Sequence, residues 1–250
     1  MSAPSPRPVA LITGASSGIG AATARRLAAE GYAVGLCARR RDRLEAVAAA
    51  IQDAGGLAFA HACDVRDPAA AEACVDAVED ALGPVRVLVN NAGLGRNAPL
   101  LEGPVEAWRE MLDTNVLALC VMTRKATASM RAHGDEGHVV HIASMAAHRV
   151  PTGSGVYAAT KFAVRALTEG LRRELRAAGS RIRVTEISPG FVETEFAEVY
   201  WGDPGAAAET YGRYRCLSAD DVADLVAFAV TRPPHVQIHD ILVRPTEQED

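Results

Sequence analysis

The chain has 250 residues, of which 49% are hydrophobic and 5% aromatic, and its formal net charge is -5. This length fits one large domain or two small ones, and the composition favours a single alanine-rich α/β core. Because the arginines are scattered and the net charge is negative, we do not expect nucleic-acid binding. There is no apolar run of the roughly 18 residues that a membrane span needs, so we expect no membrane segment.

Cysteine usage and the first residues both favour a cytoplasmic protein. The five cysteines are odd in number and have no CxxC spacing, which is typical of reduced thiols. We expect residues 1–8, which are rich in proline, to be a flexible lead-in without signal-peptide character. The seven histidines show no HExxH or other ligand spacing, and His235 and His239 lie in a predicted strand. We therefore expect no metal site.

Short apolar runs alternate with helical patterns along the chain. The predicted strands are 9–13, 34–38, 58–62, 85–90, 138–143, 182–188 and 236–243. The predicted helices are 19–30, 41–53, 68–82, 106–132, 156–178 and 219–230. Because parallel neighbours need crossover helices, this order predicts an α/β fold with a doubly wound, seven-stranded parallel sheet flanked by helices, a Rossmann fold. We find no repeat or linker, so we expect one domain over residues 1–250.

A glycine-rich turn follows the first predicted strand and opens the first predicted helix. Glycines permit a tight turn and a close backbone approach, and a helix N-terminus offers unpaired N–H groups to a pyrophosphate. The sequence therefore predicts a dinucleotide site at this turn. Its expected contacts are Gly14, Ser16, Ser17, Gly18, Ile19 and Gly20.

Two arginines, Arg39 and Arg40, follow the second predicted strand, and the first carboxylate after them is Asp42. An acidic residue at this point would bind the ribose 2′-OH of NAD, whereas arginine accommodates the 2′-phosphate of NADP. We therefore expect NADP(H), with Arg39 as the leading contact and Arg40 as the second. The alternative is that these arginines are the solvated start of the next helix.

Polar residues also follow the third and fourth predicted strands. Open parallel sheets bind ligands at the carboxyl edge of their strands, where these residues are expected to meet. Asp64 can accept a hydrogen bond from an adenine amino group; alternatively it is the N-cap of the helix that begins near Pro68. The expected cofactor contacts at this edge are Asp64, Val65, Asn91, Ala92 and Gly93.

Tyr157 and Lys161 lie one helical turn apart, and Lys161 is one of only two lysines in the chain. A phenol with an ordinary pKa of about 10 is a poor acid near neutrality. A cation at i+4 lies on the same helix face and is expected to lower that pKa toward the range useful for acid/base catalysis. The alternative is an exposed pair on an amphipathic helix, but the glycine-rich turn in the same chain favours catalysis.

Taken in order, these motifs resemble the short-chain dehydrogenase/reductase family in its compact, single-domain, NADP(H)-dependent form. The resemblance runs from Val9 to about Pro245 and rests on the glycine-rich turn, Asp64, residues 90–93, Asn115, Ser144, Tyr157 with Lys161, and Pro189 with Gly190. It implies that Tyr157 protonates a carbonyl oxygen as hydride arrives, and that Ser144 polarises the same oxygen. Lys161 would bind the nicotinamide ribose and lower the pKa of Tyr157.

The same resemblance implies a water held by Asn115, which would link Lys161 to solvent. Judged alone, Asn115 could instead be a helix-bending polar residue and Ser144 an ordinary loop serine. The segment that seats the nicotinamide would comprise Pro189, Gly190, Val192 and Thr194. After Ser144, many family members have a glycine where this chain has Met-Ala-Ala-His148. His148 either faces the substrate pocket or is a loop histidine without a contact role, and we favour the second.

The alternation of helices and strands breaks between residues 194 and 218, where five aromatic residues gather: Phe196, Tyr200, Trp201, Tyr211 and Tyr214. The resemblance implies a mobile lid over the substrate. The rings either contact substrate or form a cluster that pins the lid to the sheet. Arg213 and Arg215 either recognise a substrate carboxylate or are solvated.

We therefore expect an oxidoreductase that transfers hydride between NADP(H) and the carbonyl or hydroxyl of a small organic substrate, as a ketone or aldehyde reductase. One alternative is a dehydrogenase that oxidises a β-hydroxy acid or related alcohol. Another is a non-catalytic dinucleotide-binding sensor. The resemblance also implies a homodimer or homotetramer that pairs through the helices carrying Asn115 and Tyr157, with close packing permitted near Ala118 and Ala166.

Overall fold

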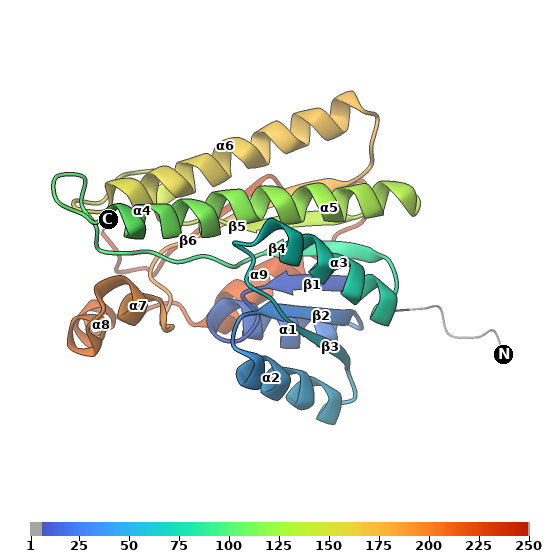
Figure 1. Ribbon diagram of the computed structural model, residues 1–250, viewed down its shortest axis with the longest axis horizontal. Coiled ribbons are helices and arrows are strands. Elements are labelled where there is room, and N and C mark those ends of the chain that lie inside the picture. Colours follow the sequence, from blue (N-terminus) through green and yellow to red (C-terminus); the bar gives the residue numbers. More distant parts are fainter. Residues whose placement is uncertain (1–6, 250) are drawn as a thin grey trace.

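The computed structural model describes residues 7–249, and its centre is a seven-stranded sheet between two layers of helices (Figure 1). The strand order is β3-β2-β1-β4-β5-β6-β7, and every neighbouring pair is parallel. The predicted doubly wound sheet is confirmed. Residues 1–6 of the predicted lead-in lie outside the described residues, whereas Pro8 accepts a hydrogen bond from the Ala33 N–H.

The strands agree with the predicted ranges to within one residue at each end, except the last. They are β1 Val9–Thr13, β2 Ala33–Ala38, β3 Leu57–Ala62, β4 Val85–Asn90, β5 His138–Ile142, β6 Arg183–Pro189 and β7 Asp240–Val243. The helices are α1 Gly18–Ala29, α2 Arg41–Asp53, α3 Pro68–Leu82, α4 Val105–Leu112, α5 Ala118–Ala132, α6 Gly155–Ala177, α7 Phe196–Trp201, α8 Pro204–Tyr211 and α9 Ala219–Val230.

Each face of the sheet has its own apolar core. Side chains of α1, α2 and α9 pack on one face, with Leu27, Leu44 and Val226 fully or almost fully buried. Side chains of α3, α5 and α6 pack on the other, with Val78 and Met122 buried among them. All five residues of β1 are buried. Burial on both faces is the reason that the central strands are apolar runs rather than alternating patterns.

The predicted long helix 106–132 is not uniform. A π-helical turn, Asp113–Leu117, separates α4 from α5. The turn contains Asn115, whose buried side-chain amide hydrogen-bonds both the N–H and the C=O of Leu94. An extra residue in a helical turn redirects a side chain without breaking the helix, and such turns are frequent at functional sites. The prediction of a continuous α-helix was wrong because this buried amide requires a local change of backbone.

The last predicted strand, 236–243, is shorter than expected. Val236 closes a turn by donating to the Pro233 carbonyl, and Thr185 donates its hydroxyl hydrogen to the Ile238 carbonyl. This stretch therefore approaches β6 through turn and side-chain hydrogen bonds, and ladder pairing begins only at Asp240.

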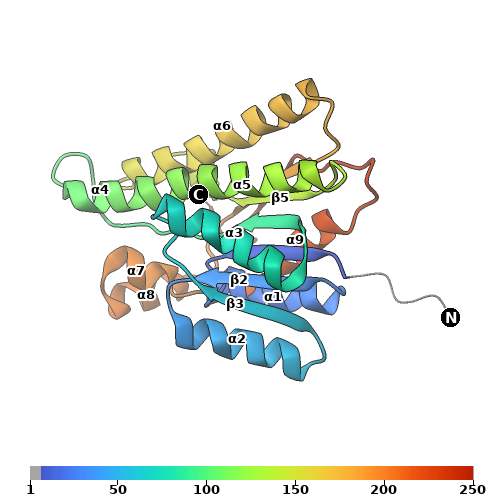
Figure 2. The ribbon, with the colours of Figure 1, turned by 45° about the vertical axis from the view of Figure 1, so that its right-hand side comes forward.

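Two short helices, α7 and α8, occupy the segment where the sequence pattern was irregular. They lie beyond the carboxyl edge of the sheet, away from the layers that cover its faces (Figures 1 and 2). Asp203 caps α8 by accepting from the Gly205 N–H, and Pro204 occupies its first turn. Asp-Pro is a helix-start signal that could have revealed α8 in the sequence. Within residues 7–249, no helix is both long and apolar enough to cross a bilayer.

Candidate active site

The glycine-rich turn and the segment after β4 meet where the strand order reverses. β1 lies between β2 and β4, so the chain leaves β1 in one direction and returns to β4 in the other. The Asn91 side chain donates to the Thr13 carbonyl at 2.9 Å, and the N–H groups of Asn91 and Ala92 donate to the Thr13 hydroxyl at 3.0 and 2.9 Å. Such a reversal is the usual ligand crevice of an open parallel sheet.

Two of the glycines are required by close approaches at this crevice. A Cβ atom on Gly20 would lie 2.4 Å from the Gly14 carbonyl oxygen, and one on Gly14 would lie 2.8 Å from the Asn91 amide nitrogen. Gly14 also has a φ of +68°, which side chains rarely adopt. The turn is therefore fixed by backbone packing against the segment after β4, with the N-terminus of α1 at its end.

Arg40 lies against the glycine-rich turn. Its guanidinium donates to the Ser16 hydroxyl at 3.1 Å and the Ser17 hydroxyl at 2.6 Å, and it pairs with Glu195 at 2.7 Å. Arg43 also pairs with Glu195. Burial opposes the effect, but the hydrogen bonds from Arg40 and Arg43 lower the pKa of Glu195 to about 2. The segment after β6 is thereby held to the predicted cofactor site by charge.

Arg39 and Asp64, both predicted cofactor residues, lie close enough to interact. The hydrogen bond from Arg66 is the main cause that lowers the pKa of Asp64. Burial acts in the raising direction, and the charge of Arg39 lowers the pKa of Asp64 further. Asp64 is not the N-cap of α3, because Asp67 fills that position by accepting from the Ala69 and Ala70 N–H groups. That alternative is excluded. The carboxylate of Asp64 instead lies free of the helix, at the carboxyl edge of β3.

This donor set fits a phosphorylated dinucleotide. Ser17, the N-cap of α1, makes no side-chain capping hydrogen bond, and the first turn of α1 carries no acidic residue. Unpaired N–H groups at a helix N-terminus bind an anion such as a pyrophosphate. Arg39 and Arg40 add two cations beside that turn, which suits a further phosphate. An acidic residue replacing Arg39 or Arg40 would oppose this fit, and none is present at those positions.

Tyr157 lies near the start of α6, with Ser144 beside it. Burial raises the pKa of Tyr157 to about 12, whereas its hydrogen bond with Ser144 acts in the lowering direction. The prediction that the pKa of Tyr157 lies below its usual value was wrong, because the effect of burial outweighs that of the hydrogen bond with Ser144. Ser144 is held in place because its oxygen accepts from the Ala146 N–H at 3.0 Å. Near neutrality Tyr157 is a protonated phenol, which suits a proton donor.

Lys161 is buried, with 7% of its surface exposed, and its ammonium donates to the Ile142 carbonyl at 3.0 Å. Its Nζ lies 5.9 Å from the centre of the Tyr157 ring. Burial lowers the pKa of Lys161 to about 8, and the charge of Glu186 opposes the shift. The predicted alternative of an exposed pair on an amphipathic helix is excluded, because Lys161 is buried.

Asn115 lies in the same cluster. A Cβ atom on Gly93 would lie 3.3 Å from the Asn115 Oδ1 atom and 3.6 Å from the Lys161 Nζ atom. Besides its two bonds to Leu94, the Asn115 amide donates to the Thr160 hydroxyl at 3.0 Å. These hydrogen bonds of the Asn115 side chain fix the loop after β4 against α6.

The predicted nicotinamide segment returns to the glycine-rich turn. A Cβ atom on Gly18 would lie 3.2 Å from the Thr194 methyl carbon. The Thr194 hydroxyl accepts from the Phe196 N–H at 3.2 Å, and Val192 forms a bridge with Leu217. The Gly190 N–H donates to the Val243 carbonyl. The structure thus places the predicted residues Pro189 to Thr194 between β6 and the crevice.

Aromatic side chains of α7 cover Tyr157. The ring centres of Phe196 and Tyr200 lie 5.5 and 6.4 Å from that of Tyr157, and Trp201 packs edge-on against Tyr200 at 4.9 Å. The Tyr200 hydroxyl also hydrogen-bonds Ser154 at 2.5 Å. Phe196 and Tyr200 therefore lie where a substrate carbonyl near Tyr157 would contact them.

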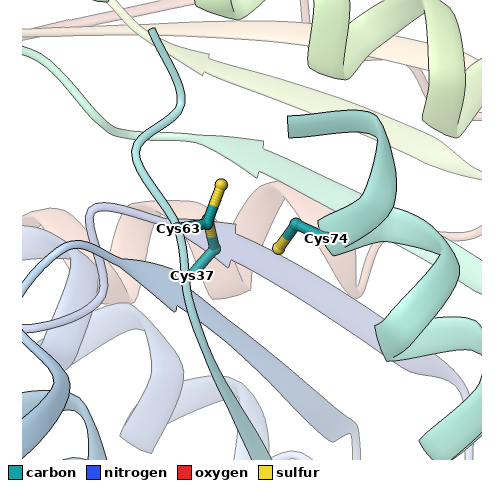
Figure 3. A group of neighbouring side chains, drawn as sticks. All are labelled: Cys37, Cys63 and Cys74. Carbon is teal, nitrogen blue, oxygen red and sulfur yellow. The ribbon is translucent and has the colours of Figure 1, made fainter. Parts of the chain in front are cut away.

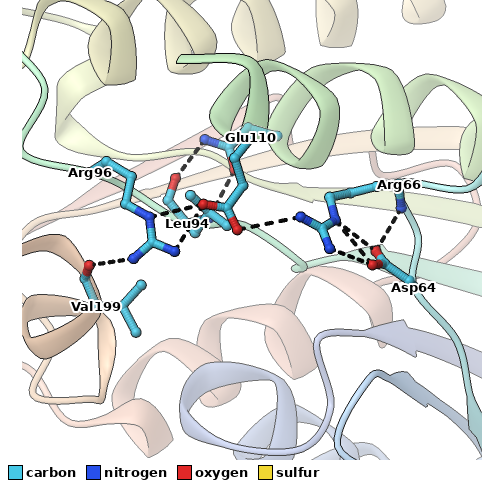
Figure 4. Close-up of polar contacts among 7 residues, drawn as sticks. Asp64, Arg66, Leu94, Arg96, Glu110 and Val199 are labelled. Carbon is cyan, nitrogen blue, oxygen red and sulfur yellow. Dashed lines mark hydrogen bonds and ion pairs between the residues drawn. The ribbon is translucent and has the colours of Figure 1, made fainter. Parts of the chain in front are cut away.

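A chain of charged residues that sequence analysis missed holds α7 from the other side (Figure 4). Arg66 binds Asp64 at 2.6 Å and Glu110 at 3.4 Å, and Glu110 in turn binds Arg96 at 2.9 Å. Arg96 donates to the Val199 carbonyl at 2.8 Å. Nothing in the local sequence marks the pairs of Glu110 with Arg66 and Arg96, since their members come from three segments that only the fold brings together.

Three remaining candidates lie away from Tyr157. His148 hydrogen-bonds Ser188 at 3.2 Å and accepts from Arg165 at 3.0 Å, so its observed contacts are within the protein. Arg213 and Arg215 are both exposed. Their positions favour the solvated alternative over recognition of a substrate carboxylate.

Comparisons with known proteins give the family of this chain. A family model described as short chain dehydrogenase matches residues 8–203. The chain is 49% identical over 246 residues to "Dehydrogenase/reductase SDR family member 11" of Gallus gallus, covering 96% of each chain. It is 42% identical over 246 residues to "Farnesol dehydrogenase" of Aedes aegypti, covering 96% of this chain and 97% of the relative.

A solved structure described as "The Closed form of serine dehydrogenase complexed with NADP+" matches with a TM-score of 0.91 at 35% identity, covering 97% of this chain and 96% of that chain. The extent of these matches shows the family as well as the fold. The chain belongs to the short-chain dehydrogenase/reductase family, and it is an oxidoreductase.

Proposed function

We propose that this oxidoreductase is an NADP(H)-dependent carbonyl reductase that reduces an apolar ketone or aldehyde and, in reverse, oxidises the corresponding alcohol. The observation that carries the proposal is the protonated phenol of Tyr157, hydrogen-bonded to Ser144 and lying close to the buried Lys161. A relative complexed with NADP+ and the two arginines beside the glycine-rich turn support the cofactor.

The chain's own residues manage one proton and one developing charge. NADPH, when bound, supplies the hydride. Reduction of a carbonyl builds negative charge on its oxygen, and donors aimed at that oxygen stabilise the transition state. Tyr157 gives its proton to this oxygen, since an alkoxide is a stronger base than a phenolate. Ser144 donates a hydrogen bond to the same atom, and the cation of Lys161 stabilises the phenolate that remains.

The cofactor contacts that we propose are the predicted ones. The turn residues hold the pyrophosphate, Arg39 and Arg40 hold the 2′-phosphate, Asp64 and Val65 border the adenine, and Asn91, Ala92 and Gly93 border the ribose. Lys161 binds the nicotinamide ribose, while Pro189, Gly190, Val192 and Thr194 seat the ring. Asn115 holds the water that links Lys161 to solvent, and its hydrogen bonds to Leu94 and Thr160 fix its side chain, whose oxygen accepts from the Leu94 N–H and can accept one more hydrogen bond.

The aromatic cover favours an apolar substrate. Phe196 and Tyr200 present ring faces and edges to Tyr157, and the exposed Arg213 and Arg215 lie outside that contact. We propose residues 194–218 as a substrate lid within a single domain. Similarity to farnesol dehydrogenase supports an apolar alcohol or carbonyl.

A second candidate is oxidation of a small hydroxy acid, which similarity to a serine dehydrogenase favours. This alternative requires a cation for the substrate carboxylate. The two candidates differ in one measurable property, the preference between apolar and carboxylate-bearing substrates.

The decisive assay follows NADPH absorbance with apolar ketones and aldehydes in parallel with keto acids, and NADP+ reduction with the corresponding alcohols and hydroxy acids. We expect turnover of apolar carbonyls, with kcat/KM at least about tenfold above that of acids of equal size. The reason is that moving a carboxylate from water to a site lined by aromatic rings costs desolvation free energy. Preference for the acids would support the second candidate. Binding of NADPH without turnover of any substrate would contradict both and favour a sensor.

The helices on one face also suggest self-association. Leu112, Leu117 and Phe162 expose 48%, 47% and 40% of their surfaces. Ala166, one helical turn after Phe162 in α6, is also exposed. The Ala118 side chain itself is 3% exposed and packs inside the chain, whereas the neighbouring Leu117 is exposed, so close packing between subunits near Ala118 stays a prediction. We propose a homo-oligomer through this apolar surface. Phe162→Glu should reduce the mass measured by light scattering, whereas the exposed Phe228→Glu on α9 should leave it unchanged.

A further inference from the structure

Three cysteines that are far apart in the sequence converge on one point beside the cofactor edge (Figure 3). Cys37 is the penultimate residue of strand β2, Cys63 directly follows β3, and Cys74 projects from the facing helix α3. Their sulfur atoms all lie within 4.8 Å of one another. The three thiols are free, and the sulfur atoms are close enough together to be ligands of a single ion.

Burial makes this cluster different from a set of surface thiols. Cys37 and Cys74 are 0% exposed and Cys63 is 6% exposed. The neighbouring side chains are apolar, including Val65, Ala71 and Val75. In such surroundings buried thiolates without a countercharge are costly.

We propose that Cys37, Cys63 and Cys74 form a binding site for a thiophilic divalent d10 metal ion of the zinc class. Thiolates are the ligands that select such ions, and three sulfurs supply three of the four positions around tetrahedral zinc, leaving the fourth for a water molecule. Sulfurs bound to one zinc ion lie about 4 Å apart, as follows from a Zn–S bond of about 2.3 Å. The observed spacing therefore needs only a small contraction.

Charge favours a divalent over a monovalent ion. Three thiolates carry three negative charges, so a divalent ion leaves one uncompensated charge in the apolar surroundings and a monovalent ion leaves two. On binding, the three S–H bonds break, three metal–sulfur bonds form, and the three protons pass to solvent. No change of oxidation state is involved.

The site lies next to the solvent-exposed carboxyl edge of the sheet. Cys63 is followed by Asp64, whose side chain is 36% exposed at the carboxyl edge of the sheet. The N–H of Cys63 donates to the Ala38 carbonyl, directly before Arg39 and Arg40. A bound ion would therefore cross-link β2, β3 and α3 immediately beneath the residues that we assign to the 2′-phosphate and the adenine.

The test titrates the full, reduced and chelator-treated chain with Cd2+, a spectroscopic counterpart of Zn2+, and follows thiolate-to-metal charge-transfer absorption in the ultraviolet. We expect saturation at about one equivalent, release of about three protons per ion, and loss of the absorption when Zn2+ is added in excess. The melting temperature should rise on addition of Zn2+ alone.

Cys74→Ala should lose most of this absorption, whereas Cys120→Ala and Cys216→Ala, which lie outside the cluster, should retain it. If Cys74→Ala does not fold, Cys63→Ser serves instead, because that residue lies at a strand end and the change preserves its size. Normal absorption in a folded variant of either cluster cysteine would overturn the proposal. So would the lack of any charge-transfer absorption in the wild-type chain at saturating Cd2+.

Discussion

The two sides of the active site are held by different interactions. On the cofactor side, backbone atoms decide the geometry: Gly20 fits because its hydrogen allows contact with the Gly14 carbonyl, and Asn91 is tied to Thr13. On the substrate side, rings and charged side chains decide it, with Tyr200 over Tyr157 and an arginine on the α7 backbone. A backbone-defined site is rigid, whereas a cover held by side chains can open for substrate.

After the loss of the proton donor Tyr157 itself, the largest effect should come from the charge that stabilises the phenolate. Lys161→Met keeps most of the side chain's volume and removes its cation, so we expect the reductase kcat to fall by about 100- to 1000-fold, a loss typical for one stabilising group. Steady-state kinetics at saturating NADPH measure it. The matched control is Lys125→Met, which removes the other lysine, an exposed partner of Asp76. Equal losses in both variants would contradict the catalytic role of Lys161.

The next effect should appear on the cofactor side. Arg40→Ala removes a charge-assisted contact with the proposed 2′-phosphate, which is worth about 1.5–3 kcal/mol. We therefore expect an increase of about 10- to 100-fold in the Kd of NADPH, with the Kd of NADH unchanged. Arg43→Ala, which removes a second partner of Glu195, is the control. A larger loss in Arg39→Ala than in Arg40→Ala would identify Arg39 as the leading contact.

The pH dependence should be smaller and should come from Lys161. Because burial lowers its pKa to about 8, Lys161 loses its charge as the pH rises through that value, and the reductase rate should fall by about tenfold between about pH 7 and about pH 9, where only about a tenth of the charge remains. Tyr157, with a pKa of about 12, stays protonated over the same range. Measuring kcat from about pH 6 to about pH 10 tests this. A rate that stays constant across pH 8, or a decline that persists in Lys161→Met, would be inconsistent with it.

The smallest effect should come from the charged chain on the substrate side. Glu110→Gln weakens two partly exposed ion pairs, with Arg66 and Arg96, so α7 should cover Tyr157 less firmly. We expect kcat/KM for the carbonyl substrate to fall about threefold to fivefold, with the Kd of NADPH nearly unchanged. Glu106→Gln, an exposed change on the same helix, should have no effect. Equal changes in NADPH affinity and kcat/KM would show that these ion pairs do not act through α7.

Local patterns were sufficient to predict the sheet and the positions that lie near one another along the chain. The glycine-rich turn is predictable because its chemistry depends on eight consecutive residues, and the pairing of Tyr157 with Lys161 follows from helix geometry alone. The strand order also follows, since alternating apolar runs and helices leave few alternatives.

Features that depend on burial could not be predicted in this way. The pKa of Tyr157 is set by how deeply the aromatic cover encloses it, which reversed the expected direction. The π-helical turn exists because Asn115 must reach Leu94, and the convergence of Cys37 with Cys74 needs the packing of α3 on β2. Each requires knowledge of contacts between segments that lie far apart in the sequence.

The most direct test of the central claim replaces Tyr157 by phenylalanine. With a carbonyl substrate and NADPH, Tyr157→Phe should lower the single-turnover rate by about 100- to 10,000-fold, the usual contribution of a general acid. Its Kd for NADPH should match that of the wild type, and Tyr214→Phe, whose ring packs against Phe191, should retain full activity. A Tyr157→Phe variant with a rate near that of the wild type would show that another group delivers the proton.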